Sequence, residues 1–410
     1  MPVIKNITGQ KIYNSLGDPA LEVEVELDSG EKARASAPSG AIVAKYEAVD
    51  IKNIDHVAEN ANGIILQNLK GKDIFLQAEI DKTLINLDGT ENKSQLGANA
   101  LLSVSIAVAR VASLAQKMPF YQYLAKLYGG DKQVRMNLPS PMFNLINGGV
   151  HADNNLTMQD FMVVPIDSDL SFSQKMAIGV KIFKTLEKKL KLMGKAINVG
   201  DEGGFAPQLN SNEEALEFLV EAIKKAGFAP GKEVVLAVDV AADNIPQLSI
   251  ATYPYQPIDY YRRVCVEYPL TILEDPFKQD DWQGWADATA DLGSKIAIVG
   301  DDLFSTNINR LKKGIEMKAG NSISVKPNQI GTLSETFAVI KLAREANFEV
   351  QISHRAGETE DDFIADLAVA VGAKYLKAGA PNRGERIAKY DQLLRIEKEL
   401  GKDFFLNNFS

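Results

Sequence analysis

The N-terminal part of the chain contains a strict alternation of apolar and polar residues. Apolar side chains at positions 21, 23, 25 and 27 alternate with glutamates at positions 22, 24 and 26, which is the pattern of a β-strand with one buried face. An Asp-Ser-Gly turn follows at 28–30, so residues 31–37 are predicted to return as the partner strand. A helical pattern then covers about 46–127, with breaks at 71–73 and 86–89. This part is therefore predicted to be α+β.

Beyond Pro139 and Pro141 the pattern changes to short β-branched runs separated by stretches long enough for helices. The runs are residues 234–238, 270–273, 296–299, 323–325, 348–352 and 375–376. Runs that are apolar on both faces are typical of parallel strands, and helical connections between them are typical of βαβ units. A repeat of roughly one strand and one helix per 25 to 35 residues favours a (β/α) barrel.

Each of these runs is followed by polar side chains. In chain order they are Asp239, Glu274, Asp301, Lys326, His354 with Arg355, and Lys377. The carboxyl ends of barrel strands share one face, and barrel enzymes have their active sites there. Three converging carboxylates form a hard oxygen site that suits Mg²⁺. A lysine beside that ion has a lowered pKa and can remove a proton next to a carboxylate, while the metal stabilises the enediolate.

Simpler interpretations exist for each of these residues. A single acid or lysine after a strand is usually a solvated turn residue, although six in succession argue against that reading. Three acids also suit a structural Ca²⁺ site, which flanking lysines would weaken. His151 on its own reads as a loop histidine, and His56 lies on a predicted helix and is treated as structural. The Asp-Glu-Gly-Gly segment at 201–204 reads either as a tight turn or as an acid held at a cleft.

Composition excludes several classes of protein. The 410 residues are 45% hydrophobic and 24% charged, and the net charge of −9 comes without a basic patch, which argues against nucleic-acid binding. The single cysteine, Cys265, excludes an internal disulfide and fits a reducing cytosol. Residues 1–8 lack the apolar core of a signal peptide. Residues 98–115 include Asn99 and Arg110, so they are predicted to form a buried helix and not a membrane span. We expect a cytoplasmic protein without membrane partners.

Seven short motifs, taken together, make the chain resemble the enolase family from Ile4 to about Lys402. They are LDGTENK at 87–93, INGG at 146–149, VGDEGG at 199–204, GDDL at 300–303, NQIGT at 328–332, SHR at 353–355 and GETED at 357–361. Enolase-superfamily sites are known to pair a Lys or His base with one or two Mg²⁺ ions. The resemblance implies an α/β fold with an N-terminal α+β domain, here residues 1–137. A modified TIM-type (β/α)₈ barrel over residues 138–410 would follow it.

The resemblance also implies a role for each candidate residue. The residues that match catalytic groups are Glu202, Lys326, Asp160 and His151. Those that match metal ligands are Asp239, Glu274 and Asp301 for a first Mg²⁺, and Ser39 for a second. Those that match substrate contacts are His151, Gln159, His354, Arg355 and Lys377. Lys326 would take the C2 proton of 2-phosphoglycerate, Glu202 would help the C3 hydroxide to leave, and Arg355 would bind the phosphate. The implied assembly is a homodimer or a larger homo-oligomer.

The chain departs from the family pattern in groups that surround the site. After Ser39 the mobile loop has Ile42, Val43 and Ala44 where the family has Ser, Thr and Gly. Asp160 replaces a Glu. The other replacements are Leu16 for Arg at the dimer contact, Ala356 for a phosphate-contacting Ser, Ala378 for Thr, and a short segment at 240–244. These changes leave two further possibilities open: a related lyase acting on another carboxylate, or a catalytically weak homologue with a binding role. The retained Arg355 argues against the first, and the retained metal ligands argue against the second.

Overall fold

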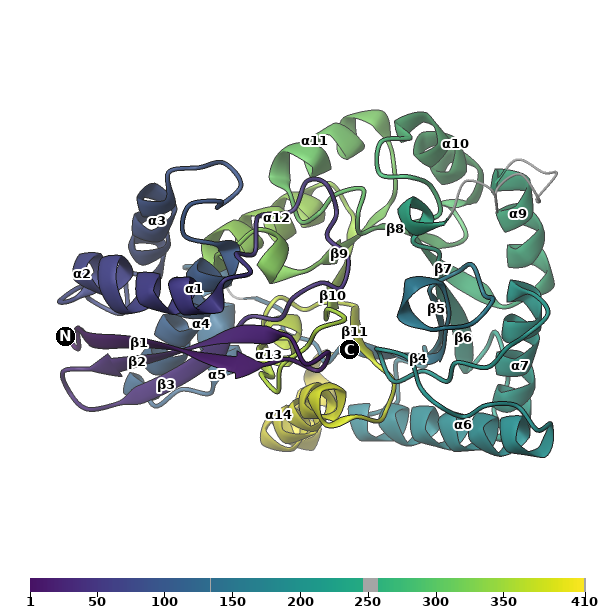
Figure 1. The fold of residues 1–410 in the computed structure, drawn as a ribbon. Coiled ribbons are helices and arrows are strands. Elements are labelled where there is room, and N and C mark those ends of the chain that lie inside the picture. The colour runs from purple at the N-terminus through teal and green to yellow at the C-terminus, as the bar shows by residue number, and fades with distance from the viewer. Residues whose placement is uncertain (133, 246–256, 409–410) are drawn as a thin grey trace. The chain divides into compact units, whose positions relative to one another are not determined.

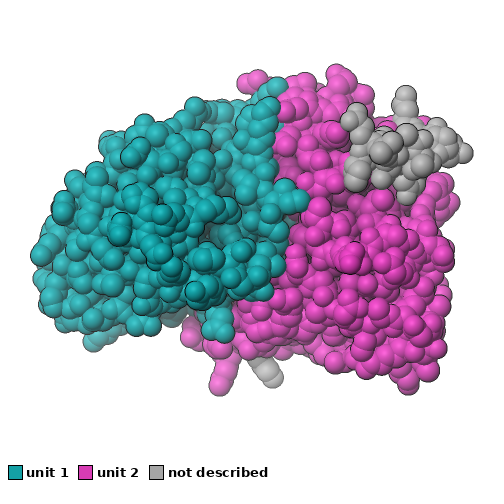
Figure 2. All heavy atoms as spheres, in the orientation of Figure 1, with its two compact units in different colours: residues 1–137, 304–313, 323–372 teal, residues 138–303, 314–322, 373–410 magenta. Residues whose placement is uncertain are grey.

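The computed structural model describes residues 1–132, 134–245 and 257–408. The chain forms two compact units, which are coloured separately in Figure 2. Unit 1 contains residues 1–137, 304–313 and 323–372, and unit 2 contains residues 138–303, 314–322 and 373–410. Each unit is therefore built from segments that lie far apart in the sequence.

A three-stranded antiparallel sheet lies near the N-terminus. Its strands are β1 (Ile4–Tyr13), β2 (Pro19–Leu27) and β3 (Lys32–Ser36), in the order β1-β2-β3. The predicted pair is confirmed as β2 and β3, and the apolar residues of β2 are buried. Strand β1 was not predicted. The pairing of β1 with β2 shifts register between Ile4 and Asn6, which interrupts the period of two that would have marked the strand.

Helices make up the rest of the N-terminal segment. They are α1 (Ile54–Asn60), a π-helical turn (Ala61–Ile65), α2 (Leu66–Leu69), α3 (Gln77–Asp88), α4 (Ala98–Ala115) and α5 (Phe120–Gly129). The predicted break at 71–73 is confirmed, whereas the one at 86–89 is confirmed only at Gly89, because α3 continues through Asp88. The predicted start at Tyr46 is wrong, because residues 46–53 form no helix and the Asn53 side chain caps α1 by accepting a hydrogen bond from the His56 amide.

Helix α4 is the buried helix that the sequence predicted. In the part of the chain that the structure describes, it is the one helix long and apolar enough to cross a membrane. However, 83% of that window is buried inside the protein, and α4 packs on β2 and β3. It is therefore a core helix of this unit.

Eight strands form a closed barrel. They are β4 (Ser140–Asn147), β5 (Asp160–Pro165), β6 (Val234–Asp239), β7 (Leu270–Glu274), β8 (Ala297–Gly300), β9 (Ser322–Val325), β10 (Glu349–Ser353) and β11 (Tyr375–Gly379), in the order β10-β11-β4-β5-β6-β7-β8-β9. The six runs read from the sequence are confirmed as β6 to β11. Strands β4 and β5 were missed. Strand β5 runs antiparallel to β4 and β6, so the barrel is a modified one, as the resemblance implied.

From β6 onward helices alternate with the barrel strands, as predicted, whereas β4 and β5 both precede α6 and α7 (Figure 1). They are α6 (Phe172–Leu192), α7 (Asn212–Lys225), α9 (Pro257–Glu267), α10 (Trp282–Leu292), α11 (Ile308–Met317), α12 (Leu333–Glu345), α13 (Phe363–Ala370) and α14 (Gly384–Asn408). Within unit 2, α6 and α7 pack on each other and on β5. An apolar cluster that includes Met142, Met162, Ile272 and Val299 fills the interior between β4, β5, β6, β7 and β8.

Candidate active site

The barrel strands place most of the candidate side chains at their carboxyl ends. Asp239 and Glu274 are the last residues of β6 and β7, and Asp301 follows the last residue of β8. In unit 1, Lys326 follows β9, and His354 with Arg355 follows β10. Lys377 differs from the sequence reading, because it lies in the middle of β11.

The reversed direction of β5 explains why Asp160 belongs to the same group. In an antiparallel strand the first residue lies at the end where its parallel neighbours finish. Asp160 begins β5 and pairs in register with Asp239, the last residue of β6. Gln159, one residue earlier, donates its backbone N–H to the Asp239 carbonyl at 3.0 Å and its side-chain amide to Asp239 Oδ2 at 3.5 Å.

Lys377 joins three buried carboxylates of unit 2. Its Nζ lies 2.7 Å from Asp239 Oδ2, 3.1 Å from Glu274 Oε2 and 3.1 Å from Asp160 Oδ2. Burial disfavours the charged lysine, but the carboxylates of Asp239, Glu274 and Asp160 outweigh it and raise the pKa of Lys377 well above its ordinary value. The chain's own groups therefore hold Lys377 as a cation, and a lowered pKa would have to come from a bound ion.

A second network in unit 2 links Asp160 to Glu202. The Asn144 amide donates to Asp160 Oδ1 at 2.7 Å and to Glu202 Oε2 at 3.0 Å, so one side chain orients both acids. Asn147 also donates to Asp160 Oδ1, at 2.9 Å, and His151 Nδ1 lies 3.1 Å from the same oxygen. Asp160 is fully buried, and its Oδ1 is contacted by Asn144, Asn147 and His151.

The same network fixes the charge of His151. Burial opposes the imidazolium, but the Glu202 and Asp160 carboxylates outweigh that penalty and raise the pKa of His151 to about 9. The imidazolium in turn favours the charged form of Asp160. Burial and Glu202 act against that form, yet Lys377 and His151 hold the pKa of Asp160 below its ordinary value. The two carboxylates therefore favour the imidazolium form of His151.

The acids of unit 2 have the chemistry of a divalent-cation site. Two groups of described residues have ligand atoms within 4.8 Å of one another: His151 with Asp160 and Glu202, and Asp275 with Asp301 and Asp302. The expected trio of Asp239, Glu274 and Asp301 is not one of these groups. Its members are nevertheless buried, and its carboxylates provide the hard oxygen ligands that Mg²⁺ prefers. The residues present thus fit a magnesium ion.

Asp275 holds Asp301 in place, and the sequence reading missed it. Its carboxylate accepts from the backbone N–H groups of Asp301 at 2.9 Å and Asp302 at 2.8 Å. Asp275 itself has a left-handed backbone with φ of 42°, which aspartate tolerates better than most residues. The position directly after Glu274 was the available signal.

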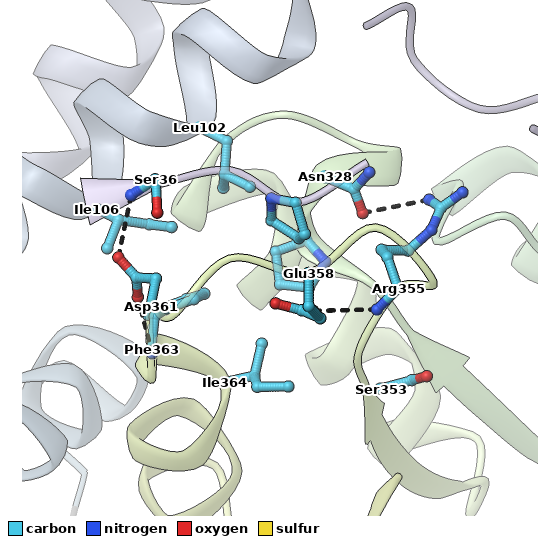
Figure 3. Close-up of a pocket in the computed structure, with 12 residues that line it drawn as sticks. Ser36, Leu102, Ile106, Asn328, Ser353, Arg355, Glu358, Asp361, Phe363 and Ile364 are labelled. Atoms are coloured by element: carbon cyan, nitrogen blue, oxygen red, sulfur yellow. Dashed lines mark hydrogen bonds between the residues drawn. The ribbon is translucent and has the colours of Figure 1, made fainter. Parts of the chain in front are cut away.

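In unit 1, Arg355 is held by residues of the segment that precedes α1. Its Nη1 lies 2.6 Å from Glu47 Oε2, its Nη2 lies 3.2 Å from Glu47 Oε1, and both side chains are 4% exposed. Asn328 Oδ1 accepts from Nη1 at 3.2 Å, and the Arg355 backbone N–H donates to Glu358 Oε1, as Figure 3 shows. Arg355 is therefore a fixed guanidinium whose charge is paired with that of Glu47.

The predicted mobile loop contacts Arg355 through its backbone. The Ile42 carbonyl accepts from Arg355 Nη2 at 3.3 Å. A side chain at Gly40 would place its Cβ 2.0 Å from that nitrogen, so only glycine fits there. The side chains of Ile42 and Val43 are 43% and 48% exposed. Ser39 pairs through its backbone with Gly357, and its hydroxyl accepts from the Asn14 amide at 2.9 Å.

The structure thus gathers the candidate residues into two groups, one in each unit. The group in unit 2 contains Gln159, Asp160, His151, Glu202, Asp239, Glu274, Asp301 and Lys377. The group in unit 1 contains Ser39, Lys326, His354 and Arg355. Sequence reasoning missed Asn144 and Glu47 as partners of these groups. A buried Asn in the apolar run of β4 was a usable signal for the first, whereas nothing local marked Glu47.

A closed barrel with buried carboxylates at its strand ends, and the buried Lys377 among them, is typical of a barrel enzyme whose site can take a divalent cation. Two family profiles specify it further. The profile of the enolase N-terminal domain matches residues 4–124, and that of the enolase C-terminal TIM barrel domain matches residues 135–408. The chain belongs to the enolase family, which confirms the resemblance read from its motifs. The match supports enolase activity, the carbon–oxygen lyase reaction of glycolysis that dehydrates 2-phosphoglycerate to phosphoenolpyruvate.

Proposed function

We propose that this chain performs the enolase reaction with a Mg²⁺ held by Asp239, Glu274 and Asp301. When bound, the ion supplies positive charge that stabilises the enediolate formed at the substrate carboxylate. The observation that carries this proposal is the set of three buried carboxylates around Lys377 in unit 2. One lysine cation cannot balance three ionised carboxylates, so a divalent cation is favoured there. The family is typically Mg²⁺-dependent, and buried carboxylates of unit 2 could bind a metal ion.

Two side chains would move protons. Lys326 takes the proton from C2 of 2-phosphoglycerate onto its Nζ, and the carboxylic acid of Glu202 gives a proton to the departing C3 oxygen. Asn144 supports this role of Glu202, because its amide donates to Glu202 Oε2 and orients the carboxyl group. His151 and Asp160 hold the charge balance beside it.

The remaining candidates would bind and orient the substrate. Arg355 would contact the phosphate with guanidinium N–H groups that, in this structure, donate to Glu47, Asn328 and the Ile42 carbonyl and would exchange those partners for phosphate oxygens. His354 lies beside it in the sequence. Lys377 contacts the substrate carboxylate, and Gln159 assists at the same end through its contact with Asp239. Because Lys377 is held charged by the acids around it, it can attract the carboxylate before any proton moves.

A second Mg²⁺ would have Ser39 as a ligand and fewer charged protein ligands than the first. The Ser39 hydroxyl has two lone pairs, and the Asn14 amide uses one of them, so one is left for a cation. Ile42 and Val43 add no side-chain oxygen to this loop. We therefore expect one ion to bind tightly and a second to bind only at higher Mg²⁺ concentration.

Cellular location, assembly and domain division are inferred from the same family membership. We infer a cytoplasmic homodimer, with residues 1–137 as an N-terminal domain and residues 138–410 as a catalytic barrel domain. The support is the family membership over both segments and the single, half-buried cysteine, Cys265, whose thiol pKa is raised to about 11 by burial. A thiol of this kind stays unreactive at neutral pH.

Hydrogen exchange at C2 of 2-phosphoglycerate tests the two proton-transfer roles separately. In D₂O with Mg²⁺, a Lys326→Ala variant should lose both C2 exchange and dehydration, because no base is left. A Glu202→Gln variant should lose dehydration by at least about 100-fold and retain exchange. Retained exchange in Lys326→Ala would overturn the assignment of the base, and lost exchange in Glu202→Gln would overturn the assignment of the acid.

A further inference from the structure

The turn that carries Glu202 is held by one short segment of unit 2. Four consecutive backbone carbonyls of the turn accept hydrogen bonds from residues 380–386. Gly200 accepts from Arg383 Nη1 at 3.3 Å, Asp201 from Arg386 Nη2 at 3.0 Å, Glu202 from the Ala380 N–H at 2.9 Å, and Gly203 from Asn382 Nδ2 at 2.9 Å. The backbone on both sides of Glu202 is thus fixed by one partner segment.

The two segments also touch through their backbones. Gly379, the last residue of β11, has a φ of 91°, and a Cβ there would lie 2.7 Å from the Glu202 carbonyl oxygen. The same Cβ would lie 2.9 Å from Cδ of Arg386. A glycine is therefore required where the strand end, the turn and the Arg386 side chain meet.

Arg386 is more deeply buried than Arg383, the other arginine of this segment. It is fully buried, and its Nε lies 3.4 Å from Glu385 Oε1. A buried guanidinium is costly unless its hydrogen bonds are made. Its Nη2 is directed to the carbonyl of Asp201, the residue directly before the proposed acid. This hydrogen bond satisfies a donor of the buried guanidinium and at the same time holds the turn at Asp201.

The opposite side of Glu202 is held by its side chain. Asn144 donates to Oε2, and His151 Nδ1 lies 3.7 Å from Oε1. The Asp201 N–H also donates to the His151 carbonyl at 3.1 Å. Glu202 is thus fixed at its carboxylate by Asn144 and His151, and at its backbone by the segment that contains Arg386.

We infer that Arg386 is a positioning residue that sets the place of the Glu202 carboxyl group through the Asp201 carbonyl. The inference rests on the proposed role of Glu202 as the acid for the C3 hydroxide. Arg386 touches no substrate atom in this account, and it acts on elimination and not on removal of the C2 proton.

The test compares two rates in the full-length enzyme with Mg²⁺: C2 hydrogen exchange in D₂O and dehydration of 2-phosphoglycerate. The Arg386→Met variant keeps the aliphatic stem and loses the donors. Because a misplacement of about 1 Å can cost roughly 100-fold, dehydration should fall about 10- to 100-fold. Exchange should change less than about threefold, so the exchange-to-dehydration ratio rises at least about threefold.

Two further variants make the result specific. Arg386→Lys keeps a cation with a shorter reach and should recover part of the ratio, and Asn382→Ala should raise it less than Arg386→Met does. Arg344→Met is the matched control, because Arg344 donates to the Gly372 carbonyl at 2.7 Å and touches no candidate residue through that bond. Its ratio should equal that of the wild type. If Arg386→Met fails to fold, the Lys and Asn382 variants carry the test.

The outcomes separate this inference from the proposed function. A parallel fall of exchange and dehydration in the Arg386 variants would show a merely structural residue and overturn the inference. A wild-type enzyme with neither Mg²⁺-dependent exchange nor dehydration would overturn the proposed function itself. Mg²⁺-dependent thermal stabilisation should be the same in Arg386→Met and in the wild type, since the metal ligands are untouched.

Discussion

Glu47 stabilises the fold through an ion pair with Arg355, which is remote from it in sequence. Its carboxylate pairs with Arg355, and its Oε1 also accepts from the Ala44 N–H at 2.8 Å, so it ties the loop to the guanidinium. Both partners are almost fully buried. Breaking such a pair leaves an uncompensated buried charge, which is strongly destabilising.

Replacing Glu47 by Gln therefore has a defined cost. We expect the free energy of unfolding of Glu47→Gln to fall by about 3 kcal/mol, measured by urea denaturation. Glu22→Gln is the control, because Glu22 lies on the exposed side of β2 beside Arg34 and should change stability by less than about 1 kcal/mol. Equal stability of Glu47→Gln and wild type would contradict the role of the buried pair.

Asp50 is a second buried acid of this region, and it carries a pH dependence. Burial raises its pKa to about 7, Arg355 opposes the rise, and Glu47 adds to it. Its Oδ1 has no hydrogen-bond partner among the described residues. Because the unfolded chain ionises near pH 4 while the folded chain keeps its proton to about pH 7, Asp50 lowers stability progressively across that window.

An Asp50→Asn variant should remove this penalty. We expect it to exceed the wild type by an amount on the order of 2 kcal/mol at pH 8 and by much less near pH 4. Thermal unfolding across that pH range measures the difference. A gain that is the same at every pH would show that the effect does not come from ionisation of Asp50.

At the scale of elements, the strands that could be predicted have a pattern of apolar residues within their own sequence. The strands that were missed lack such a pattern. The apolar runs of β6 to β11 and the alternation of β2 were sufficient on their own. Strand β4 is buried along nearly its whole length, which leaves no period to read, and its Pro141 looked like a boundary. The reversed direction of β5 depends on its pairing with neighbours, and no local pattern encodes pairing direction.

The candidate site followed the same rule. Asp239, Glu274 and Asp301 could be predicted because the topology of a barrel assigns strand ends to one face. Asn144, Asp275 and Glu47 could not, because each acts by hydrogen bonds or an ion pair to a side chain or backbone group that only the folded chain brings near. The helix start at Tyr46 was wrong for a related reason. Residues 46–53 contain Glu47 and are held by contacts to Arg355 and Gln329 in place of helical hydrogen bonds.

The loop around Gly40 supplies a prediction for this scale. A Cβ at residue 40 would meet Arg355 Nη2 at 2.0 Å and the Ile42 carbonyl at 2.5 Å. Gly40→Ala should therefore push the loop away from Arg355 and raise KM for 2-phosphoglycerate at least about tenfold, with a smaller change in kcat. Gly63→Ala, where a Cβ meets nothing within 4 Å, should leave both constants unchanged. An unchanged KM in Gly40→Ala would contradict the loop's role in substrate binding.

For the whole molecule, the negative charge of the site predicts a response to magnesium. An ion that binds only the folded chain stabilises it by about 2.7 kcal/mol at 100 times its Kd. We expect Mg²⁺ to raise the Tm of the wild type and chelation to reverse the rise. Asp239→Asn should lose most of the response, whereas Asp291→Asn, at an exposed position of α10, should keep it. A response that survives in Asp239→Asn would place the ion elsewhere.

The most direct test of the enolase assignment is the ultraviolet absorbance of the protein mixed with 2-phosphoglycerate. The enol double bond of phosphoenolpyruvate absorbs, and the substrate has no such bond. We predict an absorbance rise that requires Mg²⁺, stops on chelation and is absent in Lys326→Ala. No rise from the wild type with Mg²⁺ demonstrably bound would contradict the account and direct attention to other hydroxy-carboxylates.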